Sequence, residues 1–238
     1  MEISPLFQAA KDGNLDEVKK LHLEGADLNE THKNGSTALI FVAENGHLNV
    51  VKYLIENGAD PELTTKMGGT ALSRAAEQKN TEILRFLLNS GTPVGDMALI
   101  VAAREGNAEA VKILINAGAD VNARQRWGQT PLMLASREGH DRVVNLLLDK
   151  GANVRLKDKN GDTALNIAHD NENMDIAIRL KRAGAKAQIK KSIPTPSVDD
   201  DDVDDDVSDD SDADVEELMS DDDDDDLTDE IDLDDDDR

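Results

Sequence analysis

The segment Gln129-Thr130-Pro131-Leu132-Met133-Leu134-Ala135, followed by Gly139-His140, the apolar run Val143-Val144-Asn145-Leu146-Leu147-Leu148 and Gly151, decides the fold. Thr130 is a good helix N-cap, because its hydroxyl can accept a hydrogen bond from a first-turn amide. Pro131 fits the first helical position, where its missing N–H costs nothing. Gly139 and Gly151 are expected to end the two helices. The second helix carries more apolar surface than one helix pair can bury, so this helix-turn-helix unit needs neighbours.

The same motif recurs along the whole N-terminal part of the chain. Its leucine falls at Leu6, Leu39, Leu72, Leu99, Leu132 and Leu165, with spacings of 33, 33, 27, 33 and 33 residues. A period of this size is the signature of a repeat architecture, in which each unit packs only on its neighbours. Small alanines in the first helix let adjacent units approach closely, and branched aliphatic residues of the second helix fill the space between units.

The period, the Thr-Pro/Ala-Leu openings and the closing signals such as Gly25-Ala26-Asp27 resemble the ankyrin repeat family. The resemblance covers residues 1–187 and implies an all-α solenoid of helix-turn-helix repeats with β-turn fingers. It also implies a concave protein-binding face, formed by the fingers and the exposed side of each first helix. The six expected repeats are approximately 1–32, 33–65, 66–94, 95–125, 126–158 and 159–187.

One connector is six residues shorter than the others. Gly91-Thr92-Pro93-Val94-Gly95-Asp96 lies where the resemblance implies a projecting finger, so we expect that finger to be missing. Met97 replaces the threonine that caps the first helix in other repeats. Loops tolerate changes of length, so the deletion can be neutral. The alternatives are a notch in the binding surface or a changed superhelix angle.

The net charge of −25 arises at the C-terminal end of the chain. Residues 199–238 hold 26 of the 51 acidic residues and one arginine, so the first 198 residues hold 25 acidic and 25 basic groups. A segment with so many like charges cannot collapse, and we expect a disordered Asp-rich tail. Residues 188–198 form the expected linker, in which Pro194 and Pro196 prevent helix continuation.

Other features of the sequence exclude whole classes of protein. There are no cysteines, which excludes a disulfide scaffold and cysteine-ligated metal sites. No apolar run is long enough to span a membrane, and the N-terminus has no signal-peptide pattern. We therefore expect a cytoplasmic protein, or a nuclear one if the source is eukaryotic. No cofactor motif or catalytic arrangement is found.

Two patterns that could suggest chemistry have structural interpretations. His47 and His140 occupy the position where the resemblance implies a histidine that ties loop backbone. The segment Asp158-Lys159-Asn160-Gly161-Asp162 is similar to the start of an EF-hand calcium loop, but the sixth position is Thr163 instead of glycine. A finger turn, with Asn160 and Gly161 at positive φ, explains the same residues.

The candidate partner-binding residues lie on the expected fingers and at the ends of the first helices. Trp127 is the only tryptophan and falls on a finger. It is either an interface anchor, since tryptophan and arginine are enriched among hot spots, or it packs over the neighbouring finger. The full candidate set is Lys33, Asn34, Lys66, Met67, Arg104, Arg124, Gln125, Arg126, Trp127, Arg137 and Lys159.

These observations predict a non-enzymatic protein–protein interaction module that acts as a monomer and needs no cofactor. Its partner is expected to be a protein, with a basic protein as one option, because the acidic tail can engage basic surfaces or modulate access to the domain. Direct binding to nucleic acid is disfavoured, since the tail repels phosphates. The alternative is a nucleic-acid-mimicking or chaperone-like protein whose tail sequesters basic nucleic-acid-binding proteins.

Overall fold

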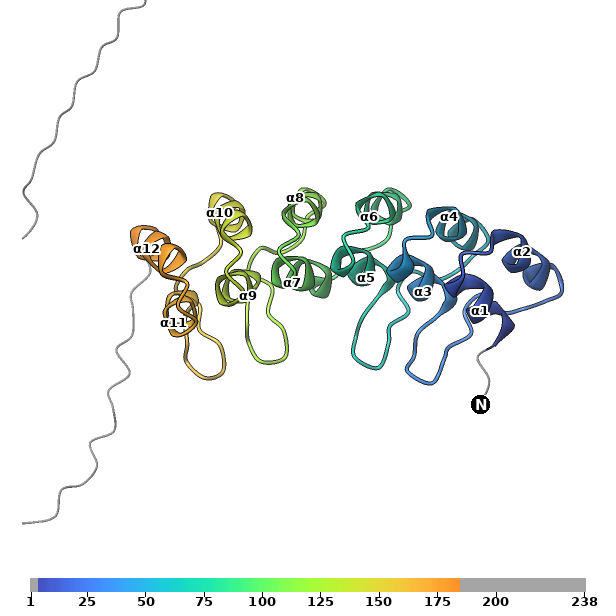
Figure 1. Ribbon diagram of the computed structural model, residues 1–238, viewed down its shortest axis with the longest axis horizontal. Helices are drawn as coiled ribbons and strands as arrows, with labels where there is room; N and C mark the ends of the chain where they lie inside the picture. Colours follow the sequence, from blue (N-terminus) through green and yellow to red (C-terminus); the bar gives the residue numbers. More distant parts are fainter. Residues whose placement is uncertain (1–3, 185–238) are drawn as a thin grey trace, which may run out of the picture. The chain divides into compact units, whose positions relative to one another are not determined.

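The computed structural model describes residues 4–184, and these residues form a row of six helix pairs (Figure 1). No strand is found within residues 4–184, so the prediction of an all-α repeat stack is confirmed. The first helices of the six pairs are α1 (Pro5–Lys11), α3 (Ala38–Asn45), α5 (Ala71–Glu77), α7 (Asp96–Arg104), α9 (Pro131–Arg137) and α11 (Ala164–Asp170). The second helices are α2 (Leu15–Leu23), α4 (Leu48–Glu56), α6 (Thr81–Asn89), α8 (Ala108–Asn116), α10 (Asp141–Asp149) and α12 (Met174–Arg182).

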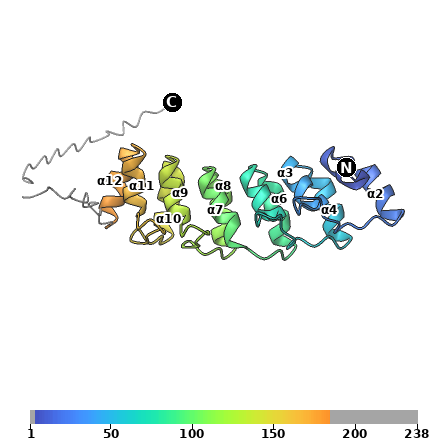
Figure 2. The same ribbon diagram turned by 90° about the horizontal axis from the view of Figure 1, so that it is seen from below.

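The helices of residues 4–184 lie in two layers. The first helices pack side by side from α1 to α11, and we call them the inner helices. The second helices, which we call the outer helices, form the other layer (Figure 1), and Figure 2 shows the same row of helix pairs from below. Each helix pair therefore contacts mainly the pair before it and the pair after it, as a repeat stack requires.

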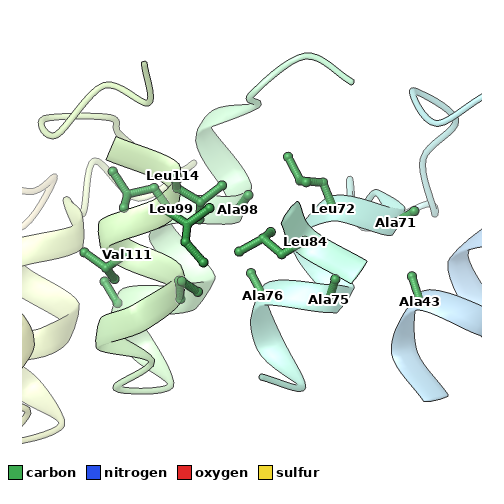
Figure 3. Close-up of a cluster of buried hydrophobic side chains, with 14 of the residues drawn as sticks. Ala43, Ala71, Leu72, Ala75, Ala76, Leu84, Ala98, Leu99, Val111 and Leu114 are labelled. Atoms are coloured by element: carbon green, nitrogen blue, oxygen red, sulfur yellow. The ribbon is translucent and has the colours of Figure 1, made fainter. Parts of the chain in front are cut away.

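A continuous aliphatic core lies between the two layers. Ala43, Ala76 and Ala103 are fully buried, and their small side chains let the inner helices approach closely. Leu84 and Leu114 of the outer helices are also fully buried and fill the space between pairs (Figure 3). Loss of such a leucine typically costs 2–5 kcal/mol. The core is thus built from small and branched residues at fixed repeat positions, and it needs few aromatics.

Threonine hydroxyls start four of the six inner helices. Each accepts a hydrogen bond from the amide three residues later, at 3.1–3.3 Å, in the pairs Thr37–Ile40, Thr70–Ser73, Thr130–Met133 and Thr163–Asn166. Pro131 occupies the first helical position, as expected. In the repeat with the short connector, α7 has Gly95 as its N-cap, so Met97 lies inside the first turn of the helix. Gly139 and Gly151 adopt positive φ one residue beyond the helix C-caps Glu138 and Lys150.

Side chains at one repeat position tie each pair to the pair before it. His47 Nε2 lies 3.0 Å from the carbonyl oxygen of Lys11, and His140 Nε2 lies 2.8 Å from that of Arg104. The structural interpretation of these histidines is therefore confirmed. Asparagine does the same work in three other repeats, where amide nitrogens donate to Ala43 (from Asn80), Ala76 (from Asn107) and Ser136 (from Asn173) at 2.8–3.0 Å.

Several expectations fall outside the described residues. They are the end of the repeat domain at 185–187, the linker at 188–198 and the Asp-rich tail at 199–238. Within residues 4–184, no helix is long and apolar enough to cross a membrane.

Candidate protein-binding face

Four finger loops project from the inner-helix layer (Figure 1). We number them finger 1 (32–36), finger 2 (65–69), finger 3 (125–129) and finger 4 (158–162). In each finger the amide of the first residue donates to the carbonyl of the fifth, at 2.8–3.1 Å, and the fourth residue is a glycine whose amide donates to the carbonyl of the first. All four glycines have positive φ, between 76° and 85°. Each finger is therefore a closed hairpin turn of the same type.

Finger 4 differs from the sequence prediction in one respect. Only Gly161 has a positive φ, so the expectation that Asn160 shares this conformation was wrong. One carboxylate oxygen of Asp158 accepts hydrogen bonds from the amides of Asn160 and Asp162, at 2.8 and 3.0 Å. Because this oxygen is used within the turn, the segment is a hairpin closed by its own aspartate. No cluster of metal-ligating side chains is found within residues 4–184.

The fingers are joined in two pairs by main-chain hydrogen bonds. The amide of Lys66 in finger 2 donates to the carbonyl of Asn34 in finger 1 at 2.8 Å. In the same way, the amide of Lys159 in finger 4 donates to the carbonyl of Trp127 in finger 3 at 3.0 Å. Fingers 1 and 2 thus support each other, and so do fingers 3 and 4.

Glycine is required where the paired fingers touch. A Cβ atom added at Gly35 would lie 3.0 Å from the backbone nitrogen of Lys66, and one at Gly128 would lie 3.3 Å from that of Lys159. Since these neighbours are backbone atoms, they cannot move aside as a flexible side chain would. The close approach of the fingers therefore depends on glycine at this turn position as well as on the hydrogen bond.

No finger lies between fingers 2 and 3. Residues 90–95 connect α6 directly to α7, and no hydrogen bond closes a hairpin within this short connector. Figure 1 shows the resulting interruption of the finger row below α5 and α7. The prediction of a missing finger is therefore confirmed, and we call this interruption the finger gap.

The tips of the fingers follow a regular chemical pattern. The second residue of every finger is basic and exposed, and the third residue is also exposed. In the fingers that border the finger gap the third residue is apolar: the exposed fraction is 85% for Met67 and 62% for Trp127. The guanidinium of Arg126 lies 5.8 Å from the centre of the Trp127 ring. The four basic residues are Lys33, Lys66, Arg126 and Lys159, and the two outer fingers carry Asn34 and Asn160.

The other predicted site residues have partners within the domain. Arg124 donates to the carbonyl of Lys157 at 2.5 Å and so joins the bases of fingers 3 and 4, and Gln125 donates to Gln129 within finger 3 at 2.6 Å. Arg137 forms an ion pair with the adjacent Glu138 at 2.9 Å. The sequence predicts a partner-binding role for these three side chains, whereas the structure shows that each contacts a residue of the domain itself.

Arg104 belongs to an ion-pair row that the sequence analysis missed. It contacts Glu77 at 3.0 Å and Glu105 at 2.8 Å, and Glu77 also contacts Arg74 at 2.6 Å. The row crosses from α5 to α7. Residues of opposite charge at the ends of successive first helices were the only signal that could have suggested it. The structure therefore brings together seven of the predicted residues as exposed fingertips, in two pairs of fingers, and it places Arg104 in this row.

This architecture defines a class of repeat scaffold that binds proteins over an extended face. Residues 6–98 and 99–191 each match the family model described as "Ankyrin repeats (3 copies)", and the chain belongs to the ankyrin repeat family. It is a protein-binding module of that family. A comparison with curated proteins finds no match.

Two solved structures are similar to the domain. One is an ankyrin repeat domain from Acinetobacter baumannii AYE, with 33% identity and a TM-score of 0.67, over 76% of this chain and 98% of that chain. The other comes from a complex of a predatory endopeptidase from Bdellovibrio bacteriovorus with an immunity protein. It has 30% identity and a TM-score of 0.68, over 76% of this chain and 99% of that chain.

Proposed function

We propose that this chain is a non-enzymatic interaction module that holds a folded protein partner against its finger row and the exposed side of its inner helices. The observation that carries the proposal is the exposure of Met67 and Trp127 at the fingertips, 85% and 62%. Burial of a large apolar side chain in an interface contributes a large favourable free energy, and tryptophan is prominent among interface hot spots. Basic residues beside them add electrostatic selection of the partner.

The relative from Bdellovibrio bacteriovorus supports a folded partner. It comes from a complex of an endopeptidase with an immunity protein, so a scaffold similar to this one takes part in a complex with another protein. By analogy, we propose that the partner of this chain is a globular protein, with the domain as an inhibitor or a carrier. The fold alone does not specify the partner, because this architecture hosts many functions.

A second candidate function rests on the C-terminal sequence. Residues 199–238 contain 26 acidic residues and one arginine, a composition that can compete with nucleic acid for basic proteins. Each exposed ion pair contributes only about 0–1 kcal/mol, but many such pairs give a multivalent and salt-sensitive association. In this case the tail would be the working part and the repeat domain a platform.

Affinity capture with four forms of the full chain distinguishes the two functions. The first form is unchanged, and the second lacks residues 192–238. The third carries glutamate at the four basic fingertips, and the fourth carries glutamate at exposed basic positions in the outer helices or directly after one of them. The fingertip set is Lys33, Lys66, Arg126 and Lys159, and the control set is Lys20, Lys112, Arg142 and Lys150.

A partner that is lost only by the fingertip form supports the proposed function, because the control form has the same change of charge. A partner that is retained by the fingertip form and lost on deletion of residues 192–238 supports the second candidate. Retention by both forms contradicts the finger row as the binding face and the tail as the working part. Thermal unfolding of each form is measured as a control, to check that the repeat domain is still folded.

A further inference from the structure

Two main-chain groups at the finger gap lack the hydrogen bond that joins the fingers within each pair. In each pair, the carbonyl of the third residue of one finger accepts from the amide of the second residue of the next finger. Met67 is the third residue of finger 2, and Arg126 is the second residue of finger 3. Within the described residues, neither the Met67 carbonyl nor the Arg126 amide has a hydrogen bond. One further finger would satisfy both groups.

The side chains beside these groups differ from those on the rest of the finger row. Met67 and Trp127 are exposed apolar residues, whereas the fingers that lie away from the gap carry asparagine at the same position. Lys66 and Arg126 add two positive charges. The borders of the gap therefore combine apolar surface, positive charge, one free acceptor and one free donor.

Both borders are held in position before any partner arrives. Finger 2 is bonded to finger 1 through Lys66 and Asn34, and finger 3 is bonded to finger 4 through Lys159 and Trp127. A surface that is already ordered loses less conformational freedom when it binds, and this favours affinity. Both sides of the site are therefore already formed, and only the finger between them is absent.

We propose that the finger gap receives a protruding turn of the partner protein, which takes the place of the missing finger. This inference rests on the proposed function and names the chemistry of the partner at that site. The turn donates a main-chain N–H to the Met67 carbonyl and offers a carbonyl to the Arg126 amide. It carries one large apolar side chain for Met67 and Trp127. Aspartate or glutamate flanks that side chain, since a basic turn would be repelled by Lys66 and Arg126.

The single tryptophan provides the readout. Trp127 is the only tryptophan of the chain and is 62% exposed, so its fluorescence reports directly on the edge of the gap. The probes are three disulfide-closed peptide hairpins without tryptophan. The first has a leucine flanked by aspartate and glutamate at its tip. The second has lysine in place of the acidic residues, and the third has alanine in place of the leucine.

We expect the acidic leucine hairpin to move the Trp127 emission to shorter wavelength in a saturable way. The lysine and alanine hairpins should bind at least about tenfold more weakly, since each lacks one of the two matching features. Binding should weaken between about 0.1 and 1 M salt, over which the Debye length falls from about 10 to about 3 Å. Equal binding of the acidic and lysine hairpins, or no emission shift with any hairpin, would overturn the proposal.

Variants separate the main-chain contact from the charge. Arg126 is the second residue of a closed turn, a position that accepts proline. Arg126→Ala removes the charge, and Arg126→Pro removes the charge and the amide donor, so we expect proline to weaken hairpin binding by roughly a further fivefold. The same two changes at Lys33 are the matched control, because the Lys33 amide also has no finger before it but lies away from the gap. Alanine and proline at Lys33 should therefore affect hairpin binding equally. An equal effect of alanine and proline at Arg126 would contradict the main-chain contact.

A second pair of variants tests the apolar border. Met67→Asn gives finger 2 the asparagine that fingers 1 and 4 have at the same position. This change should weaken binding of the acidic hairpin at least about tenfold. Leu23→Asn is the control, since Leu23 is equally exposed, 86%, but lies on α2. Equal affinity of the two variants would contradict the role of Met67.

The outcomes for the two proposals can be told apart. A partner that is lost by the fingertip charge variant but is insensitive to Met67→Asn and Arg126→Pro would leave the proposed function intact and overturn this inference. Tighter hairpin binding after removal of residues 192–238 would identify the acidic segment of this chain as the occupant, and it would overturn the assignment to a partner protein.

Discussion

The amide of Lys159 donates a hydrogen bond of 3.0 Å to the carbonyl of Trp127, and this bond joins fingers 3 and 4. The side chain of Trp127 is nevertheless 62% exposed, so its backbone is fixed while its ring remains in contact with water. An exposed aromatic ring on an ordered backbone contributes little to the folding of its own chain. It is suited to contribute to a complex.

Trp127→Ala should therefore separate affinity from stability. We expect a loss of about 2 kcal/mol in affinity for the partner that the finger row captures. The midpoint of thermal unfolding should change little, because most of the ring is already in contact with water. Calorimetric titration and a thermal melt of the same preparations measure the two effects. A lowered midpoint with unchanged affinity would mean that the ring packs on the domain instead.

Lys79→Gly should stabilise the domain. Lys79 has a φ of 62°, in the left-handed region that costs a residue with a side chain about 1 kcal/mol or more, and four of the other five repeats have glycine at this position. Part of the gain is offset by the greater freedom of glycine in the unfolded chain, so we expect roughly 0.5–1 kcal/mol in urea unfolding. Gly46→Ala, the reverse change at the equivalent position of the preceding repeat, should destabilise. A loss of stability on Lys79→Gly would show that the lysine side chain makes a compensating contact.

The glycine at this position and the histidine of the next repeat should be energetically coupled. A Cβ atom at Gly106 would lie 2.7 Å from the ring of His140, whereas one at Gly139 would lie 3.0 Å from the amide oxygen of Asn173. We expect Gly106→Ala to cost more beside His140 than in a His140→Asn background, by about 1 kcal/mol in a double-mutant cycle. His140→Asn alone should be mild, because asparagine makes the same tie in three repeats. Additive costs would exclude the steric contact.

Thr92→Val should also raise stability. Thr92 is 7% exposed, and its hydroxyl oxygen is buried without a hydrogen-bond partner within residues 4–184. Removing a buried and unsatisfied polar group while keeping the shape of the side chain should gain about 1 kcal/mol. Thr130→Val is the matched control, because its hydroxyl accepts from the amide of Met133, and loss of this cap should cost about 1 kcal/mol. Chemical denaturation of both variants checks the opposite signs.

The features that were predicted from the sequence all depend on residues that lie close together along the chain. The capping role of Thr130, the place of Pro131 and the missing finger follow from residue types at fixed spacings, because hydrogen bonds within a helix turn join residues only three or four positions apart. The same holds for the histidine ties, since the histidines recur at a constant position after the first helix. Local chemistry repeated at a period of 33 residues therefore determined most of the fold.

The features that the sequence did not predict depend on contacts between repeats. The bond from Lys66 to Asn34 joins main-chain atoms, and main-chain atoms carry no sequence signal. Arg104 was expected to be free for a partner, but it pairs with Glu77 of the preceding repeat. The asparagine ties could have been found by placing Asn107 in register with His140. Binding itself depends on a second molecule, so the partner-binding role of the fingertips remains a proposal.

The finger gap also decides how the two ends of the domain can communicate. A main-chain hydrogen bond joins fingers 1 and 2, and another joins fingers 3 and 4, but within residues 4–184 no hydrogen bond at the tips links one pair to the other. A disturbance at Lys33 can reach Trp127 only through the helix layer, where the ion pair between Glu77 and Arg104 bridges α5 and α7. The helices thus form one continuous stack, whereas the fingers form two separate hydrogen-bonded pairs. A partner that fills the finger gap would join the two pairs of fingers through its own contacts.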